Sequence, residues 1–84
     1  MPEIWEETLE KMADLEHRQW SHWTAYMLRT LLKDHPELMT DHNVVRWSRQ
    51  ILIDYQDLTE TEKDSDREWA EKAMYLMRDF YEYI

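Results

Sequence analysis

The segment that decides the fold is YQDLTETEKDSDREW, residues 55–69, which marks the start of a long helix. Thr59 is followed three residues later by Glu62, and this spacing is typical of a capping box at a helix N-terminus. Acidic residues crowd the first turns, where the helix dipole stabilises negative charge. The segment therefore predicts a helix from about Thr59 to the C-terminus.

The apolar residues that follow define the face of this helix that we expect to be buried. They recur at the three- and four-residue spacing of one helical face. The stripe consists of Trp69, Ala73, Leu76, Met77, Phe80 and Ile84. The polar detail between residues 59 and 68 exceeds what a helix start requires, so this segment is also the first candidate for a functional role.

Another long helix is predicted in the N-terminal part of the chain, from about Pro2 or Glu3 to Lys33. Proline suits the first position of a helix, and the pattern continues until an Asp-His-Pro sequence ends it. One face would carry Leu9, Ala13, Trp20, Trp23, Met27 and Leu31. Glu16 falls within this face and His17 flanks it. A carboxylate among aromatic side chains is costly unless it has a partner, so Glu16 is a candidate functional residue.

A shorter helix is predicted between the two long ones, with Thr40 or Asp41 as its N-cap. Its inward residues would be Val44, Val45, Ser48, Ile51 and Leu52. The segment at residues 51–53 is apolar and rich in β-branched side chains, so we expect the chain to become extended there. The sequence thus predicts one all-α domain over residues 1–84, with three helices and a short extended connector.

Composition restricts the chemistry that this chain can perform. The chain contains no cysteine and no glycine, which excludes disulfides, thiolate zinc sites and glycine-rich phosphate loops. Its four histidines lack the spacing of a metal site. No Ser-His-Asp arrangement is inferable from the order of the residues. We therefore expect a protein without a metal, a cofactor or a catalytic activity.

The formal net charge of −9 bears on the choice of partner. Nucleic-acid binding needs clustered Lys and Arg, so it is disfavoured. A small anionic ligand held by a few arginines stays open, as does docking of the acidic surface on a basic protein; the simplest interpretation is a soluble, self-repelling surface. The sequence has no apolar signal segment and no apolar run near the roughly 20 residues of a membrane span. We expect a cytoplasmic protein that binds neither nucleic acid nor membranes.

Two elements of the sequence occur together, LEHRQW at residues 15–20 and the segment at residues 55–67. They resemble the ryanodine-receptor repeat domain, most closely its compact free-standing bacterial and phage versions. That family carries a His-x-x-Trp element, and a Tyr-x-x-Leu-[Pro/Ser/Thr] turn before an acidic stretch ending in Asp-Arg. The matching residues here are His17, Trp20, Tyr55, Leu58, Thr59, Glu62, Lys63, Asp66 and Arg67.

The middle of the chain departs from the receptor repeats, which carry a Gly-Trp-x-x-Gly-Pro turn and a small hairpin. Neither is present here, and Arg46 with Trp47 is similar to the compact bacterial variants instead. The resemblance implies a non-catalytic module. In the bacterial and phage context it implies recognition of a nucleotide-derived small molecule in a defence system.

Eight residues are candidates for a ligand site, and each has a structural alternative. They are Glu16, His17, Trp20, Arg46, Trp47, Tyr55, Asp66 and Arg67. In the ligand interpretation, Arg67 binds a phosphate or carboxylate, and Trp47 and Tyr55 stack on a planar base. In the structural interpretation, Glu16 meets Arg46 or Arg67 and locks the helices together, while the aromatic residues belong to the core.

Apolar side chains outside the expected buried faces bear on assembly. They are Ile4, Trp5 and Tyr26 in the first helix and Tyr75, Tyr81 and Tyr83 in the last. Such an excess in a small chain is often buried against a second copy, so we expect a homodimer. The functional alternatives to a ligand-binding module are an acidic protein-interaction or inhibitor module and a purely structural dimeric domain.

Overall fold

The computed structural model describes residues 2–84, which form three α-helices connected through two 3-10 turns. The helices are α1 (Pro2–Asp34), α2 (His42–Ile51) and α3 (Glu60–Tyr83), and the turns are η1 (Pro36–Thr40) and η2 (Tyr55–Asp57). The predicted all-α class and the three predicted helices are therefore confirmed. Across residues 2–84, no helix combines the length and apolar character needed to cross a membrane.

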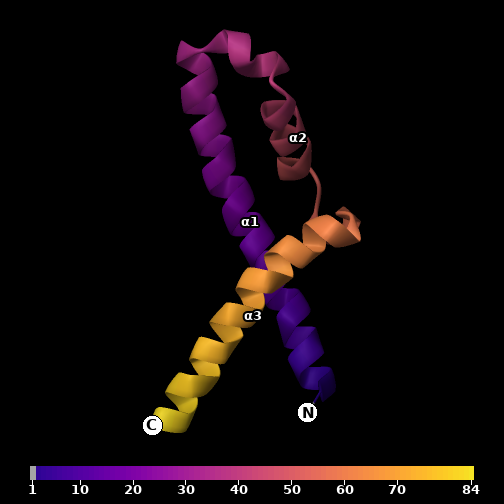
Figure 1. The fold of residues 1–84 in the computed structure, drawn as a ribbon, viewed down its shortest axis with the longest axis vertical. Coiled ribbons are helices and arrows are strands. Elements are labelled where there is room, and N and C mark those ends of the chain that lie inside the picture. The colour runs from indigo at the N-terminus through magenta and orange to yellow at the C-terminus, as the bar shows by residue number, and fades with distance from the viewer. Residues whose placement is uncertain (1) are drawn as a thin grey trace.

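The helices form a thin, elongated arrangement rather than a closed bundle (Figure 1). The chain turns back through η1 at the far end of α1, and α2 returns beside the C-terminal half of α1. α3 then crosses α1, after which the two helices diverge toward the two chain ends. The extents are 50 × 26 × 14 Å, and the shortest direction is the one along which α1 and α3 are stacked where they cross (Figure 1).

Side-chain caps fix where α2 and α3 begin. The Asp41 carboxylate accepts hydrogen bonds from the backbone N–H groups of Asn43 (2.9 Å) and Val44 (3.2 Å), which makes Asp41 rather than Thr40 the N-cap of α2. The Thr59 hydroxyl accepts from the Glu62 N–H at 3.2 Å, and the Glu62 carboxylate accepts from the Thr59 N–H at 3.0 Å. The predicted capping box is therefore confirmed.

The connector between α2 and α3 differs from the extended segment predicted at residues 51–53. Ile51 is the last residue of α2, and Leu52 keeps helical backbone angles, φ −85° and ψ −5°. The N–H groups of Leu52 and Ile53 bond to the carbonyls of the preceding turn at 3.1 and 3.3 Å, which tightens the helix end. Extended backbone is found instead at Asp54 and Leu58, on either side of η2.

The core lies where α1 and α3 cross. Ala13 of α1 and Ala70 of α3 are both completely buried there, together with Tyr55 and Leu58 from the connector. Two alanines allow the helix axes to approach closely, as larger side chains would not. Partly buried apolar side chains surround this cluster; they are Leu9, Met12 and Ile53.

The buried face of α1 agrees with the predicted one only in part, since Ala13 is fully buried and Leu9 packs against the core, but the face is rotated away from the rest of the stripe. The buried residues are Ala13, His17, Thr24 and Leu28. Trp23 and Met27, which belonged to the predicted stripe, are exposed. α3 and α2 both contact α1 on the face that carries Ala13 and Thr24. Because helices approach most closely over small side chains, this face is buried, and the face with the larger Trp23 and Met27 is exposed.

The buried face of α3 was also predicted wrongly. Only Ala70 and Met74 are buried, whereas most of the predicted stripe is exposed. The exposed members of that stripe are Trp69, Leu76, Met77, Phe80 and Ile84. The reason is geometric, because α3 contacts α1 through its N-terminal half and then runs past it (Figure 1). Within residues 2–84, nothing covers the apolar stripe beyond the crossing.

Candidate functional site

A groove between the three helices brings together five of the eight predicted site residues. We call it the tryptophan groove, and its volume is about 390 Å³. The predicted residues in its lining are His17 and Trp20 from α1, Arg46 and Trp47 from α2, and Asp66 from α3. The remaining lining residues are Gln50, Leu58, Thr61, Glu62 and Ser65. Residues more than 25 positions apart in the sequence therefore meet at one surface, as the sequence analysis proposed.

His17 is the buried histidine in the lining of the tryptophan groove. It is only 4% exposed, and its Nε2 donates a hydrogen bond to the Ile53 carbonyl at 2.6 Å. Since a carbonyl only accepts, Nε2 carries the hydrogen. The imidazole stacks on the Trp20 indole with 6.0 Å between ring centroids, and its Nδ1 lies 3.7 Å from the Asp66 carboxylate. His17 thus fixes the orientation of Trp20 and the position of the connector.

Asp66 presents a carboxylate that is poorly compensated. Its side chain is 17% exposed, and in the described part of the chain its one contact with a basic side chain is with His17 at 3.7 Å, beyond hydrogen-bond distance. Burial raises the pKa of Asp66, His17 opposes this rise, and the nearby Glu16 adds to it. A desolvated acceptor at the groove surface is the feature that a ligand donor would satisfy.

Glu62 closes one end of the groove and connects α2 to the start of α3. Its carboxylate accepts hydrogen bonds from the Arg49 guanidinium, from Gln50 Nε2 and from the Thr59 N–H. Partial desolvation acts to raise the pKa of Glu62, but the bonds from Gln50, Thr59 and Arg49 outweigh it and lower the pKa to about 2.

We expect Glu62 to make the fold sensitive to acid. Because its folded pKa lies near 2 and its ordinary value is 4.5, its stabilisation is complete above about pH 4.5 and is lost as the pH falls toward 2. Allowing for solvent screening, the contribution is about 1 to 2 kcal/mol. Denaturant unfolding of Glu62→Gln should show this deficit at neutral pH, and the deficit should shrink in acid. A deficit that is the same at pH 7 and pH 3 would contradict it; Glu71→Gln on the exposed side of α3 is the control.

Arg67 and Tyr55 lie outside the groove, in a separate ion-pair network at the helix crossing. Arg67 donates to Glu10 of α1 at 2.8 Å, and also to Glu60 at 2.8 Å and Asp64 at 2.9 Å. The Tyr55 hydroxyl donates to the second oxygen of Glu10. Hydrogen bonding to Glu60 raises the pKa of Arg67 further above its usual range, and burial followed by the Glu10 contact raises the pKa of Tyr55. Arg67 therefore joins α3 to an acidic side chain of α1, as the structural interpretation expected, but that side chain is Glu10 and not Glu16.

The predicted contact of Glu16 with Arg67 or Arg46 is wrong. Arg67 binds Glu10 instead, and Arg46 donates to Asn43 at 3.2 Å. Among residues 2–84, Glu16 forms no ion pair, although it lies near enough to Asp66 to raise the pKa of that residue. Glu10 was missed because the candidate residues of the first helix were chosen around the predicted apolar stripe, which differs from the buried face. Its spacing from Ala13 and His17, three and seven residues, was the signal that could have found it.

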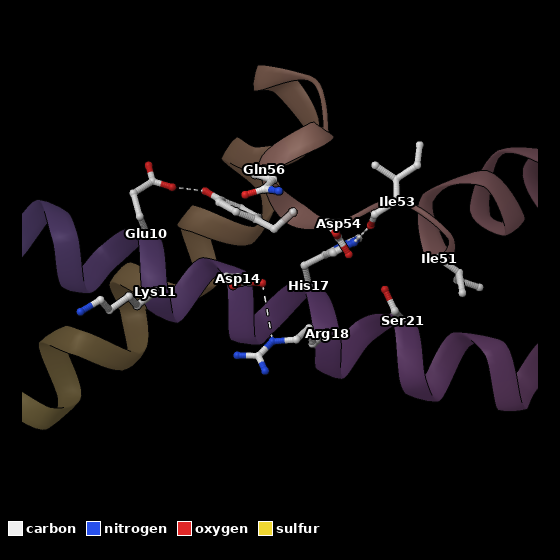
Figure 2. Close-up of a pocket in the computed structure, with 11 residues that line it drawn as sticks. Glu10, Lys11, Asp14, His17, Arg18, Ser21, Ile51, Ile53, Asp54 and Gln56 are labelled. Carbon is white, nitrogen blue, oxygen red and sulfur yellow. Dashed lines mark hydrogen bonds and ion pairs between the residues drawn. The ribbon is translucent and has the colours of Figure 1, made fainter.

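A larger cavity of about 620 Å³ lies on the other side of the connector, between α1 and residues 51–56 (Figure 2). Three of its polar side chains already have partners within the protein, whereas the buried Ser21 hydroxyl has none among residues 2–84. Glu10 binds Tyr55, His17 binds the Ile53 carbonyl, and Asp14 lies 3.6 Å from Arg18 (Figure 2). The tryptophan groove is the better candidate site because it joins two indoles to the poorly compensated Asp66 carboxylate.

Comparisons of the chain with models of known protein families, with curated proteins and with solved structures each find no match. The resemblance to the ryanodine-receptor repeat thus stays an expectation. Within residues 2–84, no group of three or more His, Cys, Asp or Glu side chains is placed to hold a metal ion. The function is therefore inferred from the residues of the tryptophan groove.

Proposed function

We propose that this chain is a small non-catalytic binding module that holds a planar, nucleotide-derived molecule in the tryptophan groove. The observation that carries the proposal is the convergence of Trp20, Trp47 and the uncompensated Asp66 from three helices on one groove. Aromatic faces bind bases of any sequence by stacking, and a few placed polar groups then select among them. The volume of about 390 Å³ is near the lower end for small-molecule pockets and suits one nucleotide.

The polar lining assigns a role to each end of such a ligand. Asp66 would accept a hydrogen bond from an exocyclic amine of the base, which relieves its desolvation. Arg46 donates one guanidinium N–H to Asn43 and retains further donors, so it would bind a phosphate at the rim of the groove. The nucleotide-derived class, the bacterial or phage defence context and the cytoplasmic location rest on the family resemblance.

A thermal-shift series with nucleotides, cyclic nucleotides and ADP-ribose tests the proposal. We expect at least one of them to raise the melting temperature of the wild-type chain in proportion to its concentration. Trp47→Leu should then weaken that ligand about tenfold or more, because stacking on an indole contributes about 1 to 3 kcal/mol per base. Trp23→Leu removes an exposed tryptophan outside the groove and should leave binding unchanged.

Asp66→Asn separates binding from folding. Because burial raises the pKa of Asp66, ionised Asp66 opposes folding at neutral pH, and the neutral amide should leave the melting temperature unchanged or raise it. The same substitution should lower ligand affinity about tenfold, since the charged acceptor is lost. An unchanged affinity in both Trp47→Leu and Asp66→Asn, or no shift from any compound, would reject the groove as the site.

The second candidate is an acidic module that docks on a basic protein surface. It is favoured by the net charge of −9 and by the exposed carboxylates that begin α1, at Glu3, Glu6 and Glu7. Binding of this kind weakens steeply as salt rises, whereas base stacking does so much less. Pull-down from a lysate at low and high salt distinguishes the two candidates.

A further inference from the structure

The part of α3 beyond its crossing with α1 exposes an apolar surface that one copy of the chain leaves uncovered. Leu76 is 70% exposed, Phe80 61% and Tyr83 88%. Figure 1 shows this half of α3 running away from the rest of the molecule toward the C-terminus. The surface is separate from the tryptophan groove and does not depend on the function proposed for it.

Four exposed residues and the half-buried Ala73 follow the seven-residue repeat of a helix-pairing seam. Trp69, Ala73, Leu76, Phe80 and Tyr83 are separated alternately by four and three residues. These are consecutive d, a, d, a and d positions, with Met77 and Ile84 at the flanking e positions. A helix that only faces water has no physical need for such a stripe. We call these five residues the α3 seam.

The size of the seam matches what a stable dimer buries. Aromatic side chains bury about 150 to 250 Å² each, so the exposed parts of the seam with Met77 and Ile84 amount to about 800 Å². A standard interface buries about 800 Å² per partner, whereas the largest apolar patch on a monomer is usually about 300 to 600 Å². The seam is therefore large enough to hold two copies together.

The charge of this region also permits two copies to meet. Residues 69–84 carry two cationic and three acidic side chains, a net charge of −1, while the whole chain carries −9. Most of the negative charge that would make two copies repel each other therefore lies in residues 1–68. Lys72 and Asp79 occupy the g positions that border the seam and are seven residues apart.

The order of these charges selects the orientation. In a parallel pair, g positions face e positions, which would place Lys72 and Asp79 against Met77 and Ile84 of the other copy. In an antiparallel pair, g faces g, and Lys72 of each copy lies opposite the partner's Asp79. Within one copy, Lys72 contacts Glu68 at 3.3 Å and lies over the Trp69 ring at 4.2 Å, and Asp79 contacts Arg78 at 3.7 Å. These exposed contacts are weak enough to rearrange.

We infer that two copies of this chain pair antiparallel through the α3 seam. The two-fold axis passes between Ala73 and Leu76, so that Trp69 packs on the partner's Phe80, and Ala73 on the partner's Leu76. The small Ala73 then faces the larger Leu76 at the centre of the overlap, which lets the two helices approach closely. Trp5, which the sequence analysis assigned to a dimer surface, packs instead on Tyr75 of its own copy at 5.3 Å.

Sedimentation equilibrium tests the inference at the level of mass. The wild-type chain should have twice its 10.6 kDa mass at micromolar concentrations, and Leu76→Glu should have the mass of one copy. Leu52→Glu is the matched control, because Leu52 is 86% exposed on the turn after α2 and should leave the dimer intact. Circular dichroism confirms that each variant is helical. A monomeric wild-type chain, or a helical Leu76→Glu dimer of unchanged affinity, would overturn the inference.

Charge reversal and cross-linking test the orientation. Lys72→Glu and Asp79→Lys should each weaken the dimer several-fold, and the double variant should recover the wild-type affinity. Because the chain has no cysteine, Lys72→Cys and Asp79→Cys supply unique thiols. Mixing the two variants should give a mixed disulfide, whereas neither should cross-link to itself. Absence of the mixed disulfide, while the two variants still form a dimer, would reject the antiparallel seam.

Discussion

Replacing Arg67 with methionine is expected to destabilise the fold by about 2 to 3 kcal/mol, because it leaves acceptors at the helix crossing without their donor. Arg67 binds Glu10, Glu60 and Asp64 at once, and its side chain is only 23% exposed. Without the guanidinium, these carboxylates would repel one another. Thermal unfolding followed by circular dichroism should show a melting temperature lower by about 10 to 20 °C, a large effect for a domain of this size.

The pH dependence of this deficit identifies its cause. Arg67 lowers the pKa of Glu60, so that contribution is present above the ordinary value of 4.5 and is lost as the pH falls below it. The deficit of Arg67→Met should therefore decrease in acid. Arg78→Met, at a half-exposed arginine whose ion pairs are with Asp79 and Glu82 at 3.7 and 4.0 Å and whose guanidinium lies over the Tyr75 ring, should cost less than about 1 kcal/mol. Equal deficits in the two variants would remove the special role assigned to Arg67.

Helix positions were predictable because their signals are local. Asp41 and Thr59 cap the helices that follow them through bonds to residues two or three positions away. Such contacts are encoded by spacing alone, without knowledge of the rest of the fold. The 3-10 turn at the connector was not predictable in the same way, because apolar β-branched residues suit an extended chain and a tightened helix end equally well.

The buried faces were not predictable because they depend on where helices cross. A period of 3.6 residues identifies an apolar stripe, but it does not say which neighbour covers the stripe. In α1 the contact follows small residues, so Trp23 is exposed although it has apolar character and suitable spacing. In α3 the apolar stripe was identified correctly as a pattern, but within residues 2–84 Leu76 and Phe80 stay mostly exposed.

Five of the eight candidate site residues meet at one surface, whereas one predicted contact between the candidates does not form. His17, Trp20, Trp47 and Asp66 meet in the tryptophan groove although they lie on three helices. Glu16 was expected to be the partner of Arg67, but Glu10 takes that place because α3 crosses α1 nearly two turns earlier. A motif can indicate which residues matter, whereas the crossing point decides which of them touch.

The crossing point itself is tested by replacing Ala70 with leucine, which we expect to destabilise the fold by about 3 kcal/mol. Ala70 is completely buried against the cluster that contains Ala13, Tyr55 and Leu58, and added carbon atoms there have no space without moving α3 away from α1. Denaturant unfolding measures the loss as a lower midpoint with an unchanged slope. Glu71→Leu places the same side chain on the exposed side of α3 and should change stability by less than about 0.5 kcal/mol.

The same substitution should also weaken the Arg67 network, because Arg67 precedes Ala70 by three residues just as Glu10 precedes Ala13. Separating the helices at the alanines therefore lengthens the Glu10–Arg67 contact, which is 2.8 Å in the native fold. In a double-mutant cycle, Ala70→Leu and Arg67→Met should together cost less than the sum of their separate effects. If the two effects were strictly additive, the Glu10–Arg67 ion pair and the alanine contact would form independently. That result would contradict a single crossing point that holds both contacts.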